Sequence, residues 1–296
     1  MRSTRIAASK LMLILGALAA ISLGPGCQSS EPRLANPPST TEARSRTLQQ
    51  LMTRLENNQK SFRTMTARCN VLLQSPLLPS HANRLELSGE LQLLKPRKIR
   101  LVLRRMGRVA IRLVGDGENY QVDMPLFNDS YGGHYGDSIS GSAKRIHFMP
   151  DDLVDALDLQ GLFWGKPQML KAYPRRWEIT PGNINSPVIY PPVWHIDSFD
   201  ITRDPNIGAR IESSVLLDRR NEQILRIDKF HNNGDLRVRM WHRNPSLVRG
   251  QDSSVRLPGG LIIWYPSPLE GTVINIRFSN RKVNVPVPEE RFILGG

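Results

Sequence analysis

Apolar and polar residues alternate along four successive segments between Leu85 and Met124. These segments centre on Leu85–Leu93, Ile99–Leu103, Val109–Leu113 and Tyr120–Met124. A period of two sends neighbouring side chains to opposite faces of a strand, so each strand has one apolar and one polar face. The connections between the segments are short turns, as at Met106-Gly107. The pattern predicts an antiparallel meander with one buried face and one face in water.

The same alternation returns in the C-terminal half of the chain. Asn233-Gly234 is a strong signal for a two-residue hairpin turn. It joins the first two of five further segments, which are Ile224–His231, Leu236–His242, Leu261–Tyr265, Thr272–Phe278 and a short Val283–Val287 tail. Between the two halves, residues 125–147 break the pattern, and we expect a long, mobile, Gly-rich loop from Asn128 to Ser142.

Two segments have the three- and four-residue spacing of helices. Five apolar residues predict one amphipathic helix over roughly residues 40–61, and they are Leu48, Leu51, Met52, Leu55 and Phe62. A Ser39–Glu42 capping box would begin that helix. Pro150, followed by Asp151 and Asp152, suits the start of a second helix that ends near Leu159. With no repeat and no change of composition, one curved sheet of about ten or eleven strands with two helical elements is the simplest account.

The first 26 residues have the organisation of an export signal. Basic residues precede an apolar run from Leu11 to Leu23, which is shorter than the roughly 20 residues of a spanning helix. Small residues then lead to Cys27. This order resembles a bacterial lipoprotein signal, which implies cleavage after residue 26, a lipid on Cys27 and a tether over residues 27–38. An ordinary signal with an incidental Cys, or a retained anchor helix, remains open.

Charge and cysteine usage narrow the class of protein. Removing residues 1–26 takes away three basic residues and no acid, which lowers the net charge from +13 to +10. Export argues against nucleic acid as the partner of this basic chain and leaves anionic lipid head groups or acidic polymers. Cys69 alternates with Ala67 and Val71, so we expect a buried core thiol.

The sequence offers little support for an enzyme. It contains neither a Gly-x-Ser-x-Gly elbow nor a His-Glu-x-x-His motif. Gly136-Asp137-Ser138-Ile139 resembles the nucleophile block of GDSL-type hydrolases, but it lies in the middle of an all-β pattern. His134 and Asp137 share that loop without further ligands at metal spacing. We expect no catalytic residue, no metal and no cofactor.

The order of features resembles the LolA/LolB superfamily of lipoprotein carriers and receptors. The resemblance rests on the Lys95-Pro96-Arg97 turn after a strand, the Asp116-Gly117 turn before one, and the Asn284–Phe292 tail. It covers most of Ser39–Phe292 and implies one domain over residues 39–296. The implied fold is mainly β with a few helices: an incomplete, strongly curved antiparallel β-barrel covered by helices, with room for acyl chains. Extra length at the Gly-rich loop and over residues 166–205 departs from the family.

The resemblance and the strand pattern together suggest three groups of site residues. Acyl chains would lie on the inward apolar set, which is Leu87, Leu91, Ile99, Leu101, Leu103, Ile111, Leu113, Tyr120 and Val122. These residues could equally pack against the first helix. Leu77 and Leu78, at a proline-bounded turn, would enter a membrane or else fold back onto the rim of the sheet. Arg100, Arg104, Arg108 and Arg112 would bind phosphate head groups or form a solvated face.

These features lead to one principal hypothesis and two alternatives. The principal one is a monomeric lipoprotein, anchored by its N-terminal lipid, that binds acyl chains of lipids or lipoproteins in transport at the outer membrane. Gln28 in place of an Asp after Cys27 favours the outer membrane, facing the periplasm. Its partners would be acylated cargo and a periplasmic carrier protein. The alternatives are an envelope sensor that binds a signalling partner and a structural lipoprotein with a dry core.

Overall fold

The computed structural model describes residues 46–78, 84–136, 149–163, 165–173, 176–178, 188–190, 192–201, 208–250, 253–266 and 271–294. Its helices are α2 (Leu48–Lys60), α3 (Pro150–Leu157) and α4 (Gln160–Phe163), with 3-10 turns at Pro125–Phe127 and Glu289–Phe292. Within these ranges, none of the helices has both the length and the apolar character that crossing a bilayer requires.

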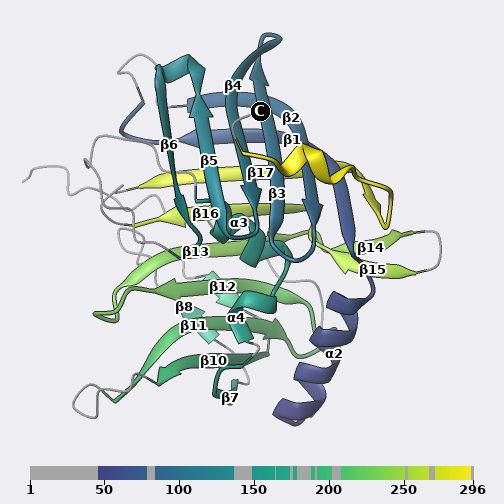
Figure 1. Ribbon diagram of the computed structural model, residues 1–296. Coiled ribbons are helices and arrows are strands. Elements are labelled where there is room, and N and C mark those ends of the chain that lie inside the picture. The colour runs from purple at the N-terminus through teal and green to yellow at the C-terminus, as the bar shows by residue number, and fades with distance from the viewer. Residues whose placement is uncertain are drawn as a thin grey trace, which may run out of the picture.

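Thirteen strands form one large antiparallel sheet (Figure 1). Their order is β6 (Asp129–His134), β5 (Asn119–Met124), β4 (Arg108–Asp116), β3 (Lys98–Arg105), β2 (Arg84–Leu94), β1 (Thr64–Gln74), β17 (Thr272–Val283), β16 (Gly260–Tyr265), β13 (Leu236–Arg243), β12 (Ile224–Phe230), β11 (Ala209–Asp218), β10 (Val193–Ile201) and β7 (Gln168–Tyr173). Two small hairpins pair β14 (Ser246–Arg249) with β15 (Ser254–Leu257) and β8 (Arg176–Glu178) with β9 (Val188–Tyr190). β6 and β7 are the two edges, so this sheet does not close on itself.

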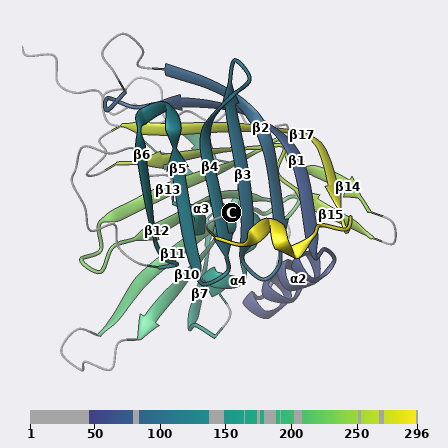
Figure 2. The ribbon, with the colours of Figure 1, turned by 45° about the horizontal axis from the view of Figure 1, so that its top comes forward.

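The sheet curls around α3, as Figures 1 and 2 show. Asp155 on α3 contacts Arg97 in the β2–β3 turn and also Lys229 on β12. Five strands separate β3 from β12 in the sheet order, so one short helix reaches both only because the sheet is strongly bent. The predicted fold class, an incomplete curved antiparallel barrel with helices, is confirmed.

The alternation of apolar residues predicted which side chains of the N-terminal strands share a face. Leu91 lies opposite Leu101, Leu101 opposite Leu113, and Leu113 opposite Val122. Directly opposed residues share a face, so these leucines form a continuous apolar row on the concave side. The predicted hairpin at Asn233-Gly234 is also present, and it joins β12 to β13.

Both predicted helices are present, but the first begins at Leu48 rather than near residue 40. α3 begins at Pro150 as expected. The first helix, α2, is capped by Thr47, whose hydroxyl accepts a hydrogen bond from the backbone N–H of Gln50. The proposed Ser39–Glu42 capping box lies outside the described residues.

The loop predicted from Asn128 to Ser142 was wrong for its first part, because Asp129–His134 forms the edge strand β6. A Cβ on Gly132 would come within 2.7 Å of the Tyr120 carbonyl oxygen, so close strand packing requires glycine there. Strands β7 and β10 lie in the segment that looked like an insertion. These additional strands explain why the sheet has thirteen strands rather than about eleven.

Candidate functional site

The nine residues of the inward apolar set all lie on the concave face of β2–β5. Each is at most 6% exposed, and all belong to one hydrophobic cluster. The same cluster contains four apolar residues of α3, namely Leu153, Val154, Ala156 and Leu157. The structure therefore brings the predicted set together. In this conformation, protein side chains rather than a ligand cover it, and its role in acyl binding stays a prediction.

Among the described residues of β1–β6, none of the buried side chains is charged. Within the described part of β1–β6, the buried polar residues are Thr64 and Gln92, and neither carries a charge. Burial of an ion in such a place would be costly, whereas burial of a carbon chain gains roughly 25 cal/mol per Å² of apolar area. This half of the concave face is therefore chemically suited to an acyl chain.

The other half of the concave side holds a buried ionic network. Lys229 on β12 lies 2.5 Å from Asp155 and 3.1 Å from Asp152, and Arg237 on β13 also pairs with Asp152. The Tyr265 hydroxyl donates a hydrogen bond to Asp152 at 3.2 Å. Burial alone would raise the pKa of Asp152, but Arg237 and Lys229 lower it below its usual range. The pKa of Asp151 is raised by burial and by the charge of Asp152.

Two further bases hold α3 on its opposite flank. Arg97 pairs with Asp155 at 3.1 Å, and Lys95 lies 3.3 Å from Asp158. The Lys95 ammonium also donates to the Gln59 backbone oxygen at 2.7 Å and stands 3.9 Å from the centre of the Phe62 ring. α3 is thus fixed to both halves of the sheet, at the β2–β3 turn and at β12 and β13, and through Lys95 to α2. From the sequence, Asp151 and Asp152 were interpreted only as residues that favour the start of a helix. The signal that could have revealed the ionic network is the set of four aspartates along an otherwise apolar helix, namely Asp151, Asp152, Asp155 and Asp158.

Leu77 and Leu78 fold back onto the sheet, which is the second of the two arrangements that the sequence left open. Leu78 is 5% exposed within the core, and Leu77 is partly buried against it. The turn is held by Ser75, whose hydroxyl hydrogen-bonds Thr272 at 2.8 Å and accepts from the Leu77 N–H. Contact of these leucines with a membrane stays a prediction, and it would require them to leave the core.

The most exposed large apolar side chain among the described residues is Met106, which is 96% exposed. It occupies the two-residue turn between β3 and β4 with a left-handed φ of 49°. A non-glycine residue in this region carries strain of about 1–2 kcal/mol, and such strain is often kept where function needs it. Arg104, Arg105 and Arg108 flank the turn and are exposed. The sequence showed this turn and its arginines but not that they form a bare hairpin tip.

The four predicted head-group arginines lie on the convex side of β3 and β4. Arg100 and Arg112 are partly buried, whereas Arg104 and Arg108 are exposed. Burial, and then the positive charges of Arg291, Arg112 and Arg104, lower the pKa of Arg100. Arg291 belongs to the C-terminal 3-10 turn, which crosses the convex face beside β3 and β4 (Figure 2). The arginines Arg100, Arg104, Arg112 and Arg291 therefore form a convex arginine cluster, with Arg108 apart at the hairpin.

Of the remaining candidate residues, some lie within the described part of the chain and others lie outside it. Cys69 is a free, buried thiol, as expected, and burial raises its pKa to about 12. Cys27, and Asp137 to Ile139 of the GDSL-like block, lie outside the described residues. In the described ranges, no group of three or more His, Cys, Asp or Glu side chains has the arrangement of a metal site.

Comparisons with known proteins identify the fold but not the family of the chain. No protein-family model and no curated protein matches the sequence. A DUF1329 family protein from Desulfovibrio piger matches in structure with a TM-score of 0.50 and 13% identity, over 83% of this chain and 95% of that one.

Two further matches carry names related to the predicted superfamily. A LolA superfamily protein from Nitrosomonas europaea has a TM-score of 0.48 and 12% identity, over 84% of this chain and 98% of its own. An outer membrane lipoprotein-sorting protein domain from Vibrio parahaemolyticus has a TM-score of 0.47 and 10% identity, over 82% and 94%. LolA-like proteins are thus among the structures that this chain resembles, as its sequence motifs predicted. At such identities the likeness concerns the fold alone.

Proposed function

We propose that this protein is an envelope lipoprotein, anchored through Cys27, that binds acyl chains on the concave face of β2–β5 and releases them at a membrane. The observation that carries the proposal is the charge-free interior of β1–β6, where all nine predicted lining residues lie together. The names of the LolA-like structural matches suggest the same field of activity.

The chemistry on either side of α3 indicates where an acyl chain would enter. An acyl chain that replaced Leu153 or Val154 against β3 and β4 would exchange one apolar contact for another. Entry toward β12 and β13 would instead separate Lys229 and Arg237 from their carboxylates and leave buried charges unpaired, which is strongly unfavourable. The acyl chain therefore enters between the apolar residues of α3 and the N-terminal strands, while the ion pairs of α3, including those with Lys95 and Arg97 at the β2–β3 turn, stay intact and keep the helix in place.

The β3–β4 hairpin is the proposed point of membrane contact. Its tip offers one fully exposed methionine with three arginines beside it. Apolar insertion together with attraction to anionic head groups is how peripheral proteins hold a bilayer surface. The convex arginine cluster extends the positive surface below the tip, where several guanidinium groups can bind phosphate oxygens.

One alternative has an observation in its favour. Because the nine residues are buried by protein, a structural lipoprotein with a dry core also fits the packing. Mass spectrometry of organic extracts from the purified protein distinguishes the two. Acyl lipid retained at near-stoichiometric amounts supports the carrier; its absence, with no uptake of an added fluorescent fatty acid, would leave the structural alternative.

The anchor is tested separately. Growth with labelled palmitate should give a labelled, membrane-bound protein, and Cys27→Ala should abolish the label and release the protein from the membrane or leave it unprocessed. Cys69→Ala is the matched control and should keep the label. Unchanged labelling of the Cys27→Ala variant would refute the anchor.

A further inference from the structure

A second hollow lies away from the concave face of β2–β5, between α2 and the C-terminal half of the sheet. It has a volume of about 240 Å³ and is bounded by α2, the β11–β12 turn and the β14–β15 hairpin. Leu55, Leu157 and Leu257 form apolar parts of its wall, and Leu247, 60% exposed, lies among its lining residues. The volume is below the roughly 300–1,000 Å³ of sites for drug-sized ligands. It suits one medium-length chain rather than several acyl chains.

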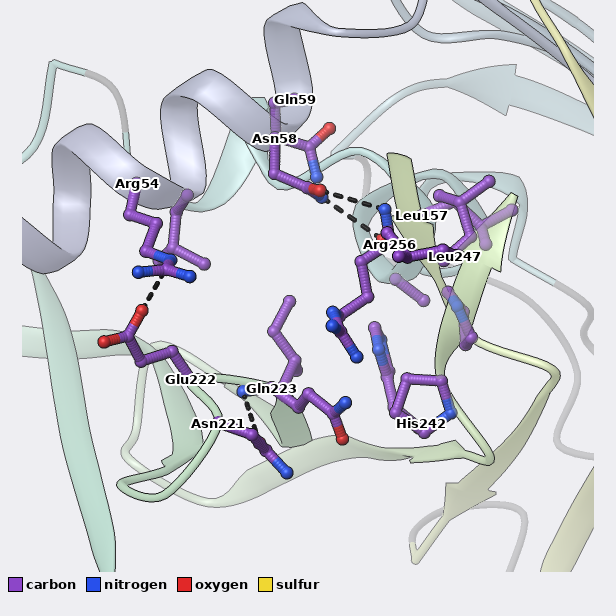
Figure 3. Close-up of a pocket in the computed structure, with 16 residues that line it drawn as sticks. Arg54, Asn58, Gln59, Leu157, Asn221, Glu222, Gln223, His242, Leu247 and Arg256 are labelled. Atoms are coloured by element: carbon purple, nitrogen blue, oxygen red, sulfur yellow. Dashed lines mark hydrogen bonds and ion pairs between the residues drawn. The ribbon is translucent and has the colours of Figure 1, made fainter. Parts of the chain in front are cut away.

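The hollow has an unbalanced positive charge. Arg54 pairs with Glu222 at 2.5 Å, and Arg46 shares that carboxylate at 3.0 Å. Within the described ranges, no carboxylate pairs with the third arginine, Arg256. Figure 3 shows its side chain reaching into the space between α2 and the β11–β12 turn. The backbone of Arg256 is held by Asn58, which accepts from its N–H at 3.0 Å and donates to its carbonyl at 3.2 Å. The backbone of Arg256 is thus fixed at the hollow, and its exposed guanidinium is available to an anion.

A buried histidine supplies the second polar group. His242 lines the same hollow and is buried, and its Nε2 atom has no hydrogen-bond partner in the described part of the chain. Its ring hydrogen-bonds the backbone of Ala156, and burial lowers its pKa to about 4, so the ring is neutral at pH 7. With Nε2 unpartnered, the bond to Ala156 uses Nδ1 as donor, and Nε2 remains as an acceptor. A buried acceptor without a partner is uncommon and favours a ligand that carries an O–H or N–H.

We propose that this hollow binds a medium-chain anionic amphiphile with a hydroxyl or amide donor close to its carboxylate or phosphate. Arg256 binds the anion, His242 accepts the donor, and the alkyl chain lies on Leu55, Leu157 and Leu257. The site shares none of the nine residues of the concave face, so it is a further site and does not depend on the function proposed above.

Isothermal titration of the purified protein with 3-hydroxydecanoate tests the proposal. Decanoate lacks the hydroxyl donor, 3-hydroxydecyl phosphate replaces the carboxylate, and decanol lacks the anion. We expect binding in the order 3-hydroxy anion, decanoate, decanol, and the two 3-hydroxy anions show whether a carboxylate or a phosphate is preferred. Arg256→Gln should weaken binding of the 3-hydroxy anions about ten- to hundredfold, the usual range for a hydrogen bond to a charged group. Arg249→Gln, on the same hairpin but outside the hollow, should change nothing.

The histidine is tested by its effect on ligand preference. His242→Phe should reduce the affinity for 3-hydroxydecanoate to that for decanoate while leaving decanoate binding unchanged. If that variant does not fold, the comparison of ligands on the native protein and on Arg256→Gln decides alone. Leu101→Trp should leave this binding intact, which separates this site from the proposed concave site. Equal binding of decanol and the anions, or no effect of Arg256→Gln, would overturn the proposal.

Discussion

The two halves of the curved sheet bury opposite kinds of side chain against the same helix. On β1–β6, the described interior is apolar and uncharged. On β12 and β13, Lys229 and Arg237 reach the aspartates of α3, and the ring of His242 is buried beside Ala156. Apolar packing has no direction and tolerates exchange of one apolar partner for another, whereas buried ion pairs require their partners. The difference assigns exchange of ligand to the apolar strands of the N-terminal half. The fixation of α3 falls to its ion pairs, which lie mainly with the C-terminal half and otherwise with Lys95 and Arg97 in the β2–β3 turn.

The largest loss of stability should come from disrupting the buried ionic network of the C-terminal half. Lys229→Met leaves Asp151, Asp152 and Asp155 with one nearby base fewer, and loss of one partner from a buried network typically costs about 3–5 kcal/mol. Urea unfolding measures this loss. Lys60→Met, at an exposed helix pair with Glu56, is the control and should cost at most about 0.5 kcal/mol. Equal effects of the two variants would contradict the role given to the network.

The free energy of unfolding should also depend on pH, because of a histidine in the C-terminal half of the sheet. Because the pKa of His242 is about 4 in the folded protein and about 6.5 when unfolded, unfolding takes up a proton between these values. The contribution of His242 to stability is therefore fully present above pH 6.5 and is lost as the pH falls toward 4. The loss is at most about 3 kcal/mol.

The measurement for this dependence is unfolding free energy against pH, for the native protein and for His242→Phe. The variant should lack the part of the slope between pH 6.5 and 4 that the histidine causes. His231→Phe, at an exposed position, should keep it. If His242→Phe and the native protein have parallel profiles, the histidine is not buried in its neutral form.

The apolar half is tested by adding bulk. Leu101→Trp overpacks a filled position and should cost about 1–3 kcal/mol. It should also abolish binding of a fluorescent fatty acid. Ile227→Trp, at a buried position on β12, is the matched control: we expect a similar loss of stability with binding retained. Loss of binding in both variants would show that the two halves do not differ in this respect.

The sequence predicted features that depend on local patterns, and it missed features that depend on contacts between residues far apart in the chain. Leu101 and Leu113 were placed on one face because period-two alternation is a local pattern. β6 was mistaken for a loop because glycine is read as flexibility, whereas Gly132 is required by the approach of the Tyr120 backbone. The pairing of Asp152 with Lys229 joins residues 77 positions apart, which no local pattern shows. Leu78 was considered a candidate for exposure, because its burial depends on contacts with distant strands.

The smallest effect on stability should come from the hairpin tip. Met106→Asp removes no buried contact, so the free energy of unfolding should change by about 0.5 kcal/mol or less. Binding to vesicles that contain anionic phospholipid should fall clearly in a sedimentation assay, because an acid replaces the inserting side chain. Met169→Asp, at a partly exposed methionine on β7, should not change vesicle binding. Unaltered binding of Met106→Asp would place membrane contact elsewhere.

The central claim, that acyl chains bind on the N-terminal half of the concave face, is tested most directly by photo-crosslinking. A fatty acid with a diazirine near its methyl end would be bound, irradiated and located by peptide mass spectrometry. The account predicts crosslinks to inward residues of β2–β5, such as Leu91, Leu101 and Val122, or to the facing residues of α3, with loss of these crosslinks in Leu101→Trp. Crosslinks confined to β10–β13 or to the convex face would contradict it.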